Sequence, residues 1–401
     1  MGRFHRDHDA GEEHRATTLE LFFDLVFVFA ITQVSHLLLD DVSWAGAGRA
    51  ALALLVVWWA WNYTTWVTNE LDPDSTVVRL VLIGVMLASL LMAISIPHAF
   101  AGRGLLFAAA YVVLQVGRHT FLTFVAAGRG TLERERAGRI LTWFAAAGVL
   151  WIAGGVAEGN ARAFLWVIAL AIDYAAPLAT YWVPGTKRLD HSAWEVQTSH
   201  FAERFQLFMI IALGETIVIT GATTSGLELT TARIVALGLA FLATAALWWL
   251  YFDYVADIAE RRLERSRDRT RLARDAYTYL HVVLVAGVIL SAVGDELVIA
   301  HPRDELPGAE LAVVVAGPAL YLVAHALFRL RLAGSIAWKR LAGAAACLGA
   351  GGAFGTFAPA IAVAALLVAV LVAVILAEHV AGFRRRARGE PSPLERLEVS
   401  A

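Results

Sequence analysis

Apolar residues run along this chain in long stretches that are separated by short polar segments. A helix needs about 20 mostly apolar residues to cross the hydrocarbon layer of a membrane, and the sequence predicts twelve such helices. Strands are not expected, because the apolar runs are too long and do not alternate with polar residues. The predicted spans are residues 19–39, 50–68, 77–96, 104–125, 138–157, 161–183, 200–221, 231–253, 276–300, 309–330, 337–353 and 358–379.

The composition agrees with an integral membrane protein. Apolar residues make up 59% of the 401 residues and charged residues 17%, whereas soluble domains have about 45–50% and about 25%. A net charge of −2 argues against a nucleic-acid partner. The single cysteine, Cys347, excludes an intramolecular disulfide and a cysteine-based zinc site, and no glycine-rich loop with a lysine is present to bind nucleotide phosphates.

The lysines and arginines give the orientation, because cytoplasmic loops carry most of the positive charge of a membrane protein. With the N-terminus inside and basic residues near span ends counted with the adjoining segment, 24 of the 33 basic residues fall on the cytoplasmic side and 5 on the outer side. The remaining 4 are assigned to spans. The sequence therefore predicts twelve spans in the bacterial cytoplasmic (inner) membrane, with both termini cytoplasmic. Acidic residues precede the first apolar run, which we interpret as an uncleaved span rather than a signal peptide.

The two halves of the chain share a pattern six spans apart. The sequence WWAW at residues 58–61 returns as WWLY at 248–251, and Glu20 and Glu203 open the first and seventh spans. The alternative is a coincidence between apolar sequences. A six-span repeat keeps its orientation and relates the halves by an axis along the membrane normal. The predicted parts are a cytoplasmic segment 1–18, a first six-helix repeat 19–183, a linker 184–199, a second six-helix repeat 200–380 and a basic, disordered tail 381–401.

Charged and polar side chains within the predicted spans are the candidate functional residues, because a charge inside a bilayer costs about 2.5 kcal/mol or more. Glu20 and Asp24 are four residues apart and share one face of their helix. Asp173 and Glu215 fall near the middle of the bilayer. The candidate substrate or ion pathway comprises Glu20, Asp24, Thr32, Gln33, Asn62, Arg79, Arg118, Asp173, His200, Glu203, Arg204, Glu215 and Asp253.

The alternative interpretation is that these groups only form ion pairs between helices or extend to the membrane surface. It suits the groups nearest the interface, namely Glu20, Arg79, Arg118 and Asp253. It suits Asp173 and Glu215 less well, because a side chain at mid-bilayer cannot reach water. A buried carboxylate there fits a proton relay or a cation site.

Two further features have less specific interpretations. His200 and Glu203 have the spacing of two metal ligands on one helix, but no second pair is evident and helix capping explains them equally well. We therefore predict no metal and no cofactor. The segment 260–275 mixes acids and arginines at helical spacing and is predicted to be a solvated cytoplasmic helix, with anionic-lipid binding as an addition.

Several motifs occur in a fixed order along the chain. They are LELFFDLVFVFA at 19–30 followed by Gln33, WWxWN at 58–62, NxxD at 69–72 followed by Arg79, HxxERF at 200–205, LGE at 213–215 and WWxYFD at 248–253. Together they resemble the bacterial low temperature requirement A (LtrA) family, except that Gln206 stands where most members have a small residue. The resemblance implies a multi-span inner-membrane protein, and the family name implies a growth phenotype in the cold rather than a chemistry.

A second resemblance concerns ion permeation. FxD at 22–24, followed by an apolar run and Thr32, is similar to the opening of the lysosomal potassium-channel family, although Phe23 replaces a serine of that motif. We predict a transporter or channel for a small ion (a cation or proton) or solute. Its expected partners are the lipid bilayer, the transported ion or solute, and further copies of the chain in a homo-oligomer. The alternatives are a membrane enzyme acting on a lipid or quinone, with His200 and Glu203 as acid and base, and a scaffold or sensor without flux.

Overall fold

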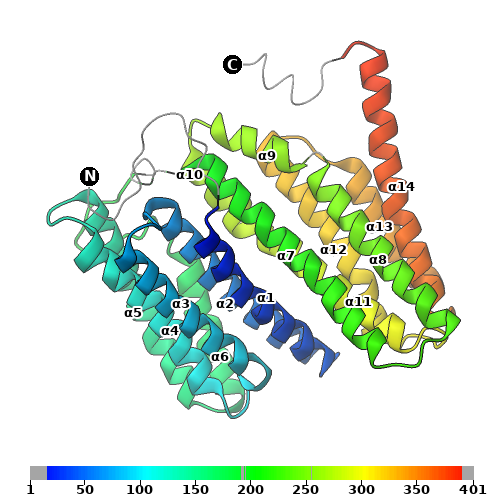
Figure 1. Cartoon of the computed structure of the whole chain (residues 1–401), viewed down its shortest axis with the longest axis horizontal. Coiled ribbons are helices and arrows are strands. Elements are labelled where there is room, and N and C mark those ends of the chain that lie inside the picture. Colours follow the sequence, from blue (N-terminus) through cyan, green and yellow to red (C-terminus); the bar gives the residue numbers. More distant parts are fainter. Residues whose placement is uncertain (1–15, 191–193, 195, 254, 391–401) are drawn as a thin grey trace. The chain divides into compact units, whose positions relative to one another are not determined.

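The computed structural model describes residues 16–190, 194, 196–253 and 255–390 (Figure 1). Within these residues the chain is helical, apart from turns and one isolated bridge between Glu305 and Pro359. The prediction of an all-helical fold is confirmed for this part of the chain. Much of the predicted N-terminal segment and residues 391–401 of the predicted tail lie outside the described residues.

Most helices follow one another with short connections, and the long connection of residues 176–197 separates α6 from α7. They are α1 (Thr18–Leu39), α2 (Trp44–Glu70), α3 (Thr76–Ser95), α4 (Gly104–Phe121), α5 (Leu132–Val156), α6 (Gly159–Ala175), α7 (Thr198–Ser225), α8 (Thr231–Phe252), α9 (Val255–Glu264), α10 (Arg269–Leu272), α11 (His281–Ala300), α12 (Gly308–Ala333), α13 (Trp338–Phe354) and α14 (Ala360–Ala387). A 3-10 turn, η1 (Ile96–His98), follows α3, and two π-helical segments, η2 (Leu122–Ala126) and η4 (Ala273–Leu280), follow α4 and α10.

Local sequence explains several helix ends. The Thr131 hydroxyl accepts a hydrogen bond from the Arg134 N–H and caps the start of α5, and Thr230 caps α8 in the same way. Such caps satisfy backbone donors that have no partner inside the helix. α12 ends where Gly334 takes a left-handed conformation with φ 63°, which glycine adopts without steric cost.

Ten helical stretches of the described chain are long and apolar enough to cross a membrane. They include every helix from α1 to α5, then α7, α8, the continuous stretch Arg269–Ala300, α12 and α14. α6 and α13 have 17 residues each, which corresponds to about 25 Å and is shorter than a hydrocarbon layer of about 30 Å. Each of the twelve predicted spans thus has a helix, and ten helical stretches are candidates for crossing the membrane by length and composition. The twelve crossings stay a prediction.

The prediction of a helix over 161–183 is wrong at its C-terminal end. α6 ends at Ala175, and Thr180 and Tyr181 have positive φ angles of 51° and 50°. The physical reason is Pro177, which has no N–H to donate to the carbonyl four residues earlier, so the ladder of helical hydrogen bonds stops there. At the other end of the chain, α14 continues to Ala387 and so extends into the segment predicted to be a disordered tail.

The chain forms two compact units. Unit 1 consists of Met1–Leu37 with Ala45–Arg204, and unit 2 of Leu38–Trp44 with Phe205–Ala401. In unit 1, α3, α4, α5 and α6 pack in chain order, each against the next. In unit 2, α11, α12, α13 and α14 do the same, and α8 packs against α11 and α14. α7 contributes its first residues to unit 1 and the remainder to unit 2.

The central element of unit 1 is α2, which is buried along most of its length. Its tryptophans Trp58, Trp59 and Trp61 are all 0% exposed. α2 receives hydrogen bonds from α4, where Arg118 binds the Thr64 hydroxyl, and from α6, where Tyr174 binds the Leu55 carbonyl. Polar side chains on α4 and α6 therefore find hydrogen-bond partners on α2.

Candidate functional site: buried carboxylates in unit 1

Two carboxylates of α1 are buried in unit 1. Glu20 and Asp24 are 1% and 0% exposed, and they share one guanidinium. The Nη2 atom of Arg204 donates to Oδ1 of Asp24 at 2.6 Å, and its Nη1 atom lies 3.3 Å from Oε1 of Glu20. Asp24 Oδ1 also accepts a hydrogen bond from the indole N–H of Trp61 at 2.8 Å. A charge in such a place is tolerated only with a partner of opposite sign.

Helix geometry brings these groups together in register. Glu20 and Asp24 are one turn apart on α1, and His200 and Arg204 are one turn apart on α7. Residues at this spacing lie on one face of a helix, so each pair faces the other. His200 contacts Glu20, and Arg204 contacts Asp24. We call Glu20, Asp24, Trp61, Asn69, His200 and Arg204 the α1 cluster.

The hydrogen bonds of Asn69 determine the protonation state of His200. Oδ1 of Asn69 accepts from the backbone N–H of Gln197 at 2.9 Å, and Nδ2 donates to the Gln197 carbonyl at 3.1 Å. These two bonds distinguish the oxygen of the Asn69 amide from its nitrogen. The nitrogen, Nδ2, therefore also donates to Nδ1 of His200 at 3.0 Å. Nδ1 therefore carries no proton. The proton is on Nε2, which lies 3.0 Å from Oε1 of Glu20, and His200 is neutral.

The charges of the α1 cluster follow from this assignment. An arginine does not lose its proton in a protein, so the described side chains carry two negative charges and one positive charge when both carboxylates are ionised. Glu20 is well supplied with donors, because Oε2 also accepts from the N–H and hydroxyl of Thr17 at 2.9 Å each. Oδ2 of Asp24 is buried and accepts no hydrogen bond from any described residue. The arrangement can bind a proton or a cation at Asp24.

A second buried carboxylate lies on α6. Asp173 is 1% exposed, and its Oδ2 atom accepts from the Tyr111 hydroxyl at 2.9 Å and from the Trp151 indole N–H at 3.0 Å. Its Oδ1 atom has no hydrogen-bond partner among the described residues. Both donors are neutral, so their hydrogen bonds do not balance the negative charge that Asp173 carries when it is ionised.

Asp173 stands at the end of a line of donors along α4. Arg118 donates to Oε1 of Gln115, Gln115 donates to the Tyr111 oxygen at 3.2 Å, and Tyr111 donates to Asp173. Arg118 also donates to the Thr64 hydroxyl at 2.6 Å. The α4 members lie four and then three residues apart, on one helix face. Successive donors that point the same way polarise one another and strengthen the last bond.

Substituting Tyr111→Phe is expected to lower the free energy of unfolding by about 1–3 kcal/mol, because both the Asp173 acceptor and the Gln115 donor lose a buried partner. The control is Tyr321→Phe in unit 2. Tyr321 is equally buried, but its hydroxyl donates to the backbone carbonyl of Leu247, which belongs to a helix. The measurement is the unfolding free energy of purified protein in detergent, and an effect no larger than that of the control would contradict the role of this line of donors.

Other predicted pathway residues are also partly or fully buried, namely Thr32, Gln33, Asn62, Glu203 and Glu215. The Thr32 hydroxyl donates to the Val28 carbonyl of its own helix at 3.1 Å. Glu203 accepts from the Ala16 backbone N–H at 2.8 Å. Glu215 is 1% exposed and belongs to unit 2. These residues are compatible with a polar role, but the contacts seen in unit 1 do not join Thr32 or Glu203 to Asp24.

Two predicted residues lie at the surface of their units instead. The Arg79 side chain is 52% exposed and pairs with Asp74 at 2.7 Å. The Asp253 side chain is 45% exposed and lies 3.5 Å from His379. Neither belongs to the buried networks described above. Within the described ranges, no group of three or more histidine, cysteine or acidic side chains is arranged to hold a metal ion.

Sequence reasoning did not include several residues that complete these networks. Trp61 and Asn69 are eight residues apart on α2, and they contact Asp24 and His200 respectively. Tyr111 and Gln115 complete the line on α4. A sequence signal was present on α4, where Tyr111, Gln115 and Arg118 have helical spacing and form a polar line on one face.

These features define a multi-pass helical membrane protein with carboxylates buried between its helices. The chain belongs to the bacterial low temperature requirement A family, since the model described as "Bacterial low temperature requirement A protein (LtrA)" matches residues 15–376. It is 39% identical over 316 residues to "Uncharacterized protein RA0937" of Rhizobium meliloti (strain 1021), which covers 78% of this chain and 76% of the relative. No solved structure matches the chain. The resemblance seen in the motifs is thereby confirmed.

Proposed function

We propose that this protein moves protons or small cations across the bacterial inner membrane, with Asp24 as the central binding group and Glu20 as its partner. The observation that carries the proposal is the buried Oδ2 atom of Asp24, which no described residue supplies with a hydrogen bond. A bare carboxylate oxygen in a membrane-spanning helix is costly unless a proton or a cation binds there.

Arg204 explains how such binding would be reversible. When both carboxylates are ionised, the guanidinium is shared between Asp24 at 2.6 Å and Glu20 at 3.3 Å. When a proton or cation neutralises Asp24, the fixed positive charge of Arg204 balances Glu20 alone. The cluster thus alternates between two states that differ by one charge, which is the requirement for carrying an ion.

The proposal includes twelve spans with both termini in the cytoplasm and two repeats of six helices. The packing within the units supports a duplication, because α3 to α6 and α11 to α14 each pack in chain order. Tyr174 of α6 stacks on Trp59 of α2 with centroids 3.8 Å apart, and α14 packs against α8. The basic residues counted above support the orientation.

A second function is favoured by the number of polar partners around Glu20. That carboxylate contacts Arg204, His200 and Thr17, which also suits a cluster that only locks α1 to α7. In this case the protein would be a scaffold or sensor without flux. The enzyme alternative is not favoured, because His200 faces Glu20 and Asn69 while Glu203 binds a backbone N–H.

The test is ion flux in proteoliposomes that contain the purified full-length protein. Gradients of protons, potassium and sodium are imposed separately, and internal pH or ion content is followed with a fluorescent indicator. Flux of at least one ion well above that of protein-free liposomes is the expected result. A folded protein that passes none of the three would favour the scaffold.

A further inference from the structure

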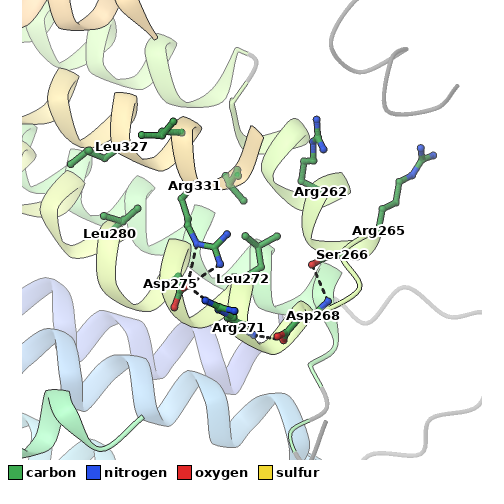
Figure 2. A pocket seen from close by; sticks show the side chains of 12 residues that line it. Arg262, Arg265, Ser266, Asp268, Arg271, Leu272, Asp275, Leu280, Leu327 and Arg331 are labelled. Atoms are coloured by element: carbon green, nitrogen blue, oxygen red, sulfur yellow. Dashed lines mark hydrogen bonds and ion pairs between the residues drawn. The ribbon is translucent and has the colours of Figure 1, made fainter. Parts of the chain in front are cut away.

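A pocket of about 930 Å³ opens in unit 2 where α9, α10 and η4 lie beside the end of α12 (Figure 2). Four arginines contribute to its lining, namely Arg262, Arg265, Arg271 and Arg331. Leucines of α10, η4 and α12 form an apolar part of the lining, and Ser266, Asp268 and Asp275 complete it. Figure 2 shows Arg331 and Arg271 on either side of Asp275, with Arg262 projecting from α9. The pocket therefore combines strong positive charge with an apolar wall.

The pocket lies at the ends of two candidate membrane spans. The candidate span Arg269–Ala300 begins beside it, and the candidate span Gly308–Ala333 ends beside it. Leu327 and Leu330, in the last turns of the second span, are each 42% exposed. Such leucines next to arginines are typical of the zone where lipid headgroups meet acyl chains.

The acidic residues of the pocket are already occupied. Asp275 accepts from Arg331 at 2.8 and 3.1 Å and pairs with Arg274 at 2.8 Å. Asp268 caps α10 by accepting from the Arg271 backbone N–H at 2.9 Å. The Nε atom of Arg262 is buried and has no hydrogen-bond partner among the described residues. Positive charge is thus in excess, and the pocket suits an anion.

We propose that this pocket binds the phosphate headgroup of an anionic phospholipid, whose acyl chains lie against Leu327 and Leu330. Arginine is suited to the group because its planar donors match two phosphate oxygens at once. A free phosphate ion would bind the arginines and leave the leucines exposed. A phospholipid would bind the arginines through its phosphate and cover the leucines with its acyl chains. This proposal requires that the protein is inserted in a membrane, and it does not require that the protein transports ions.

The experiment measures lipid retention by the full-length protein in a non-ionic detergent. The protein is incubated with phosphatidylglycerol, with phosphatidylcholine of the same acyl chains, or with inorganic phosphate, and bound lipid is counted by native mass spectrometry. Phosphatidylglycerol is expected to bind at least about tenfold more tightly than phosphatidylcholine. The double variant Arg262→Gln/Arg271→Gln is expected to lose that preference by about tenfold.

The matched control is Arg267→Gln/Arg269→Gln, which removes the same charge from exposed positions of the same segment that do not line the pocket. It is expected to retain phosphatidylglycerol as the wild type does. Equal loss in both double variants would show a diffuse surface-charge effect and overturn the pocket. Equal binding of phosphatidylcholine, or full displacement of phosphatidylglycerol by millimolar inorganic phosphate, would overturn the phospholipid as occupant. Melting temperatures without added lipid verify that the variants fold, and no readout depends on flux.

Discussion

The variant Arg204→Met is expected to lose about 3–5 kcal/mol of unfolding free energy, because it leaves two buried carboxylates without their shared cation. Glu20, Asp24 and Arg204 have side chains that are 0% exposed, so water cannot replace the guanidinium. Methionine keeps much of the volume of the side chain and fills gaps in a packed interior. The loss therefore measures charge rather than packing.

The matched control for this variant is Arg79→Met. Arg79 also pairs with an aspartate, but its side chain is 52% exposed and that of Asp74 is 87% exposed. Exposed pairs contribute only about 0–1 kcal/mol. The measurement is the unfolding free energy in detergent or bicelles, and similar values for both variants would show that the carboxylates of α1 are neutral without Arg204.

A triple variant separates charge from shape. Replacing Glu20 by glutamine and Asp24 by asparagine in the Arg204→Met background removes every formal charge of the group. Neutral replacement of a complete buried ion group is often close to neutral for stability. We expect the triple variant to recover most of the lost free energy, and a triple variant as unstable as the single one would assign the loss to packing.

Sequence reasoning identifies the helices of this protein because the apolar runs are long, but it places their ends less well. The predicted span 161–183 remains apolar beyond Ala175, and only Pro177 stops the helix. A hydropathy average covers a window of many residues, so it does not detect the effect of one proline that lacks an N–H donor. One proline therefore outweighs the apolar residues around it in setting the end of the helix.

The sequence also identifies Glu20, Asp24, His200 and Arg204 as polar residues in apolar surroundings, but not that they meet. The two pairs are 180 residues apart in the chain, and no local pattern links α1 to α7. The i, i+4 spacing on both helices is the only hint that they could face each other. Partner choice depends on which faces pack, and this is a property of the whole unit.

Burial at helix ends is the other property that sequence alone does not reveal. Arg79 opens its helix and Asp253 follows the end of another, and both are half exposed, whereas Arg118 near the end of α4 is 1% exposed. The repeated tryptophans differ in the same way, since Trp58 and Trp59 are 0% exposed while Trp248 and Trp249 are 46% and 43% exposed. The residue type is the same in the two WW sequences, and the neighbouring helices decide how far each side chain is buried.

The variant Asp24→Asn is expected to lower ion flux by at least about tenfold, because the cluster can no longer change its charge. The asparagine has the size of the aspartate, and its oxygen can still accept from Trp61 and Arg204. Glu20 and Arg204 then form a neutral pair in every state. The control Asp74→Asn removes a carboxylate whose side chain is 87% exposed and is expected to transport as the wild type does.

Stability and flux together distinguish an ion-binding cluster from a structural lock. If Asp24 binds the transported ion, Asp24→Asn loses flux but keeps or gains unfolding free energy, because one guanidinium then serves one carboxylate. If the cluster only joins α1 to α7, the same variant loses stability through a weakened bond to Arg204, and any flux of the wild type survives in the folded fraction. Flux at the wild-type rate in a stable Asp24→Asn protein would exclude Asp24 as the binding group. The next residue to substitute would then be Asp173, the other described carboxylate of unit 1 with a buried oxygen that accepts no hydrogen bond.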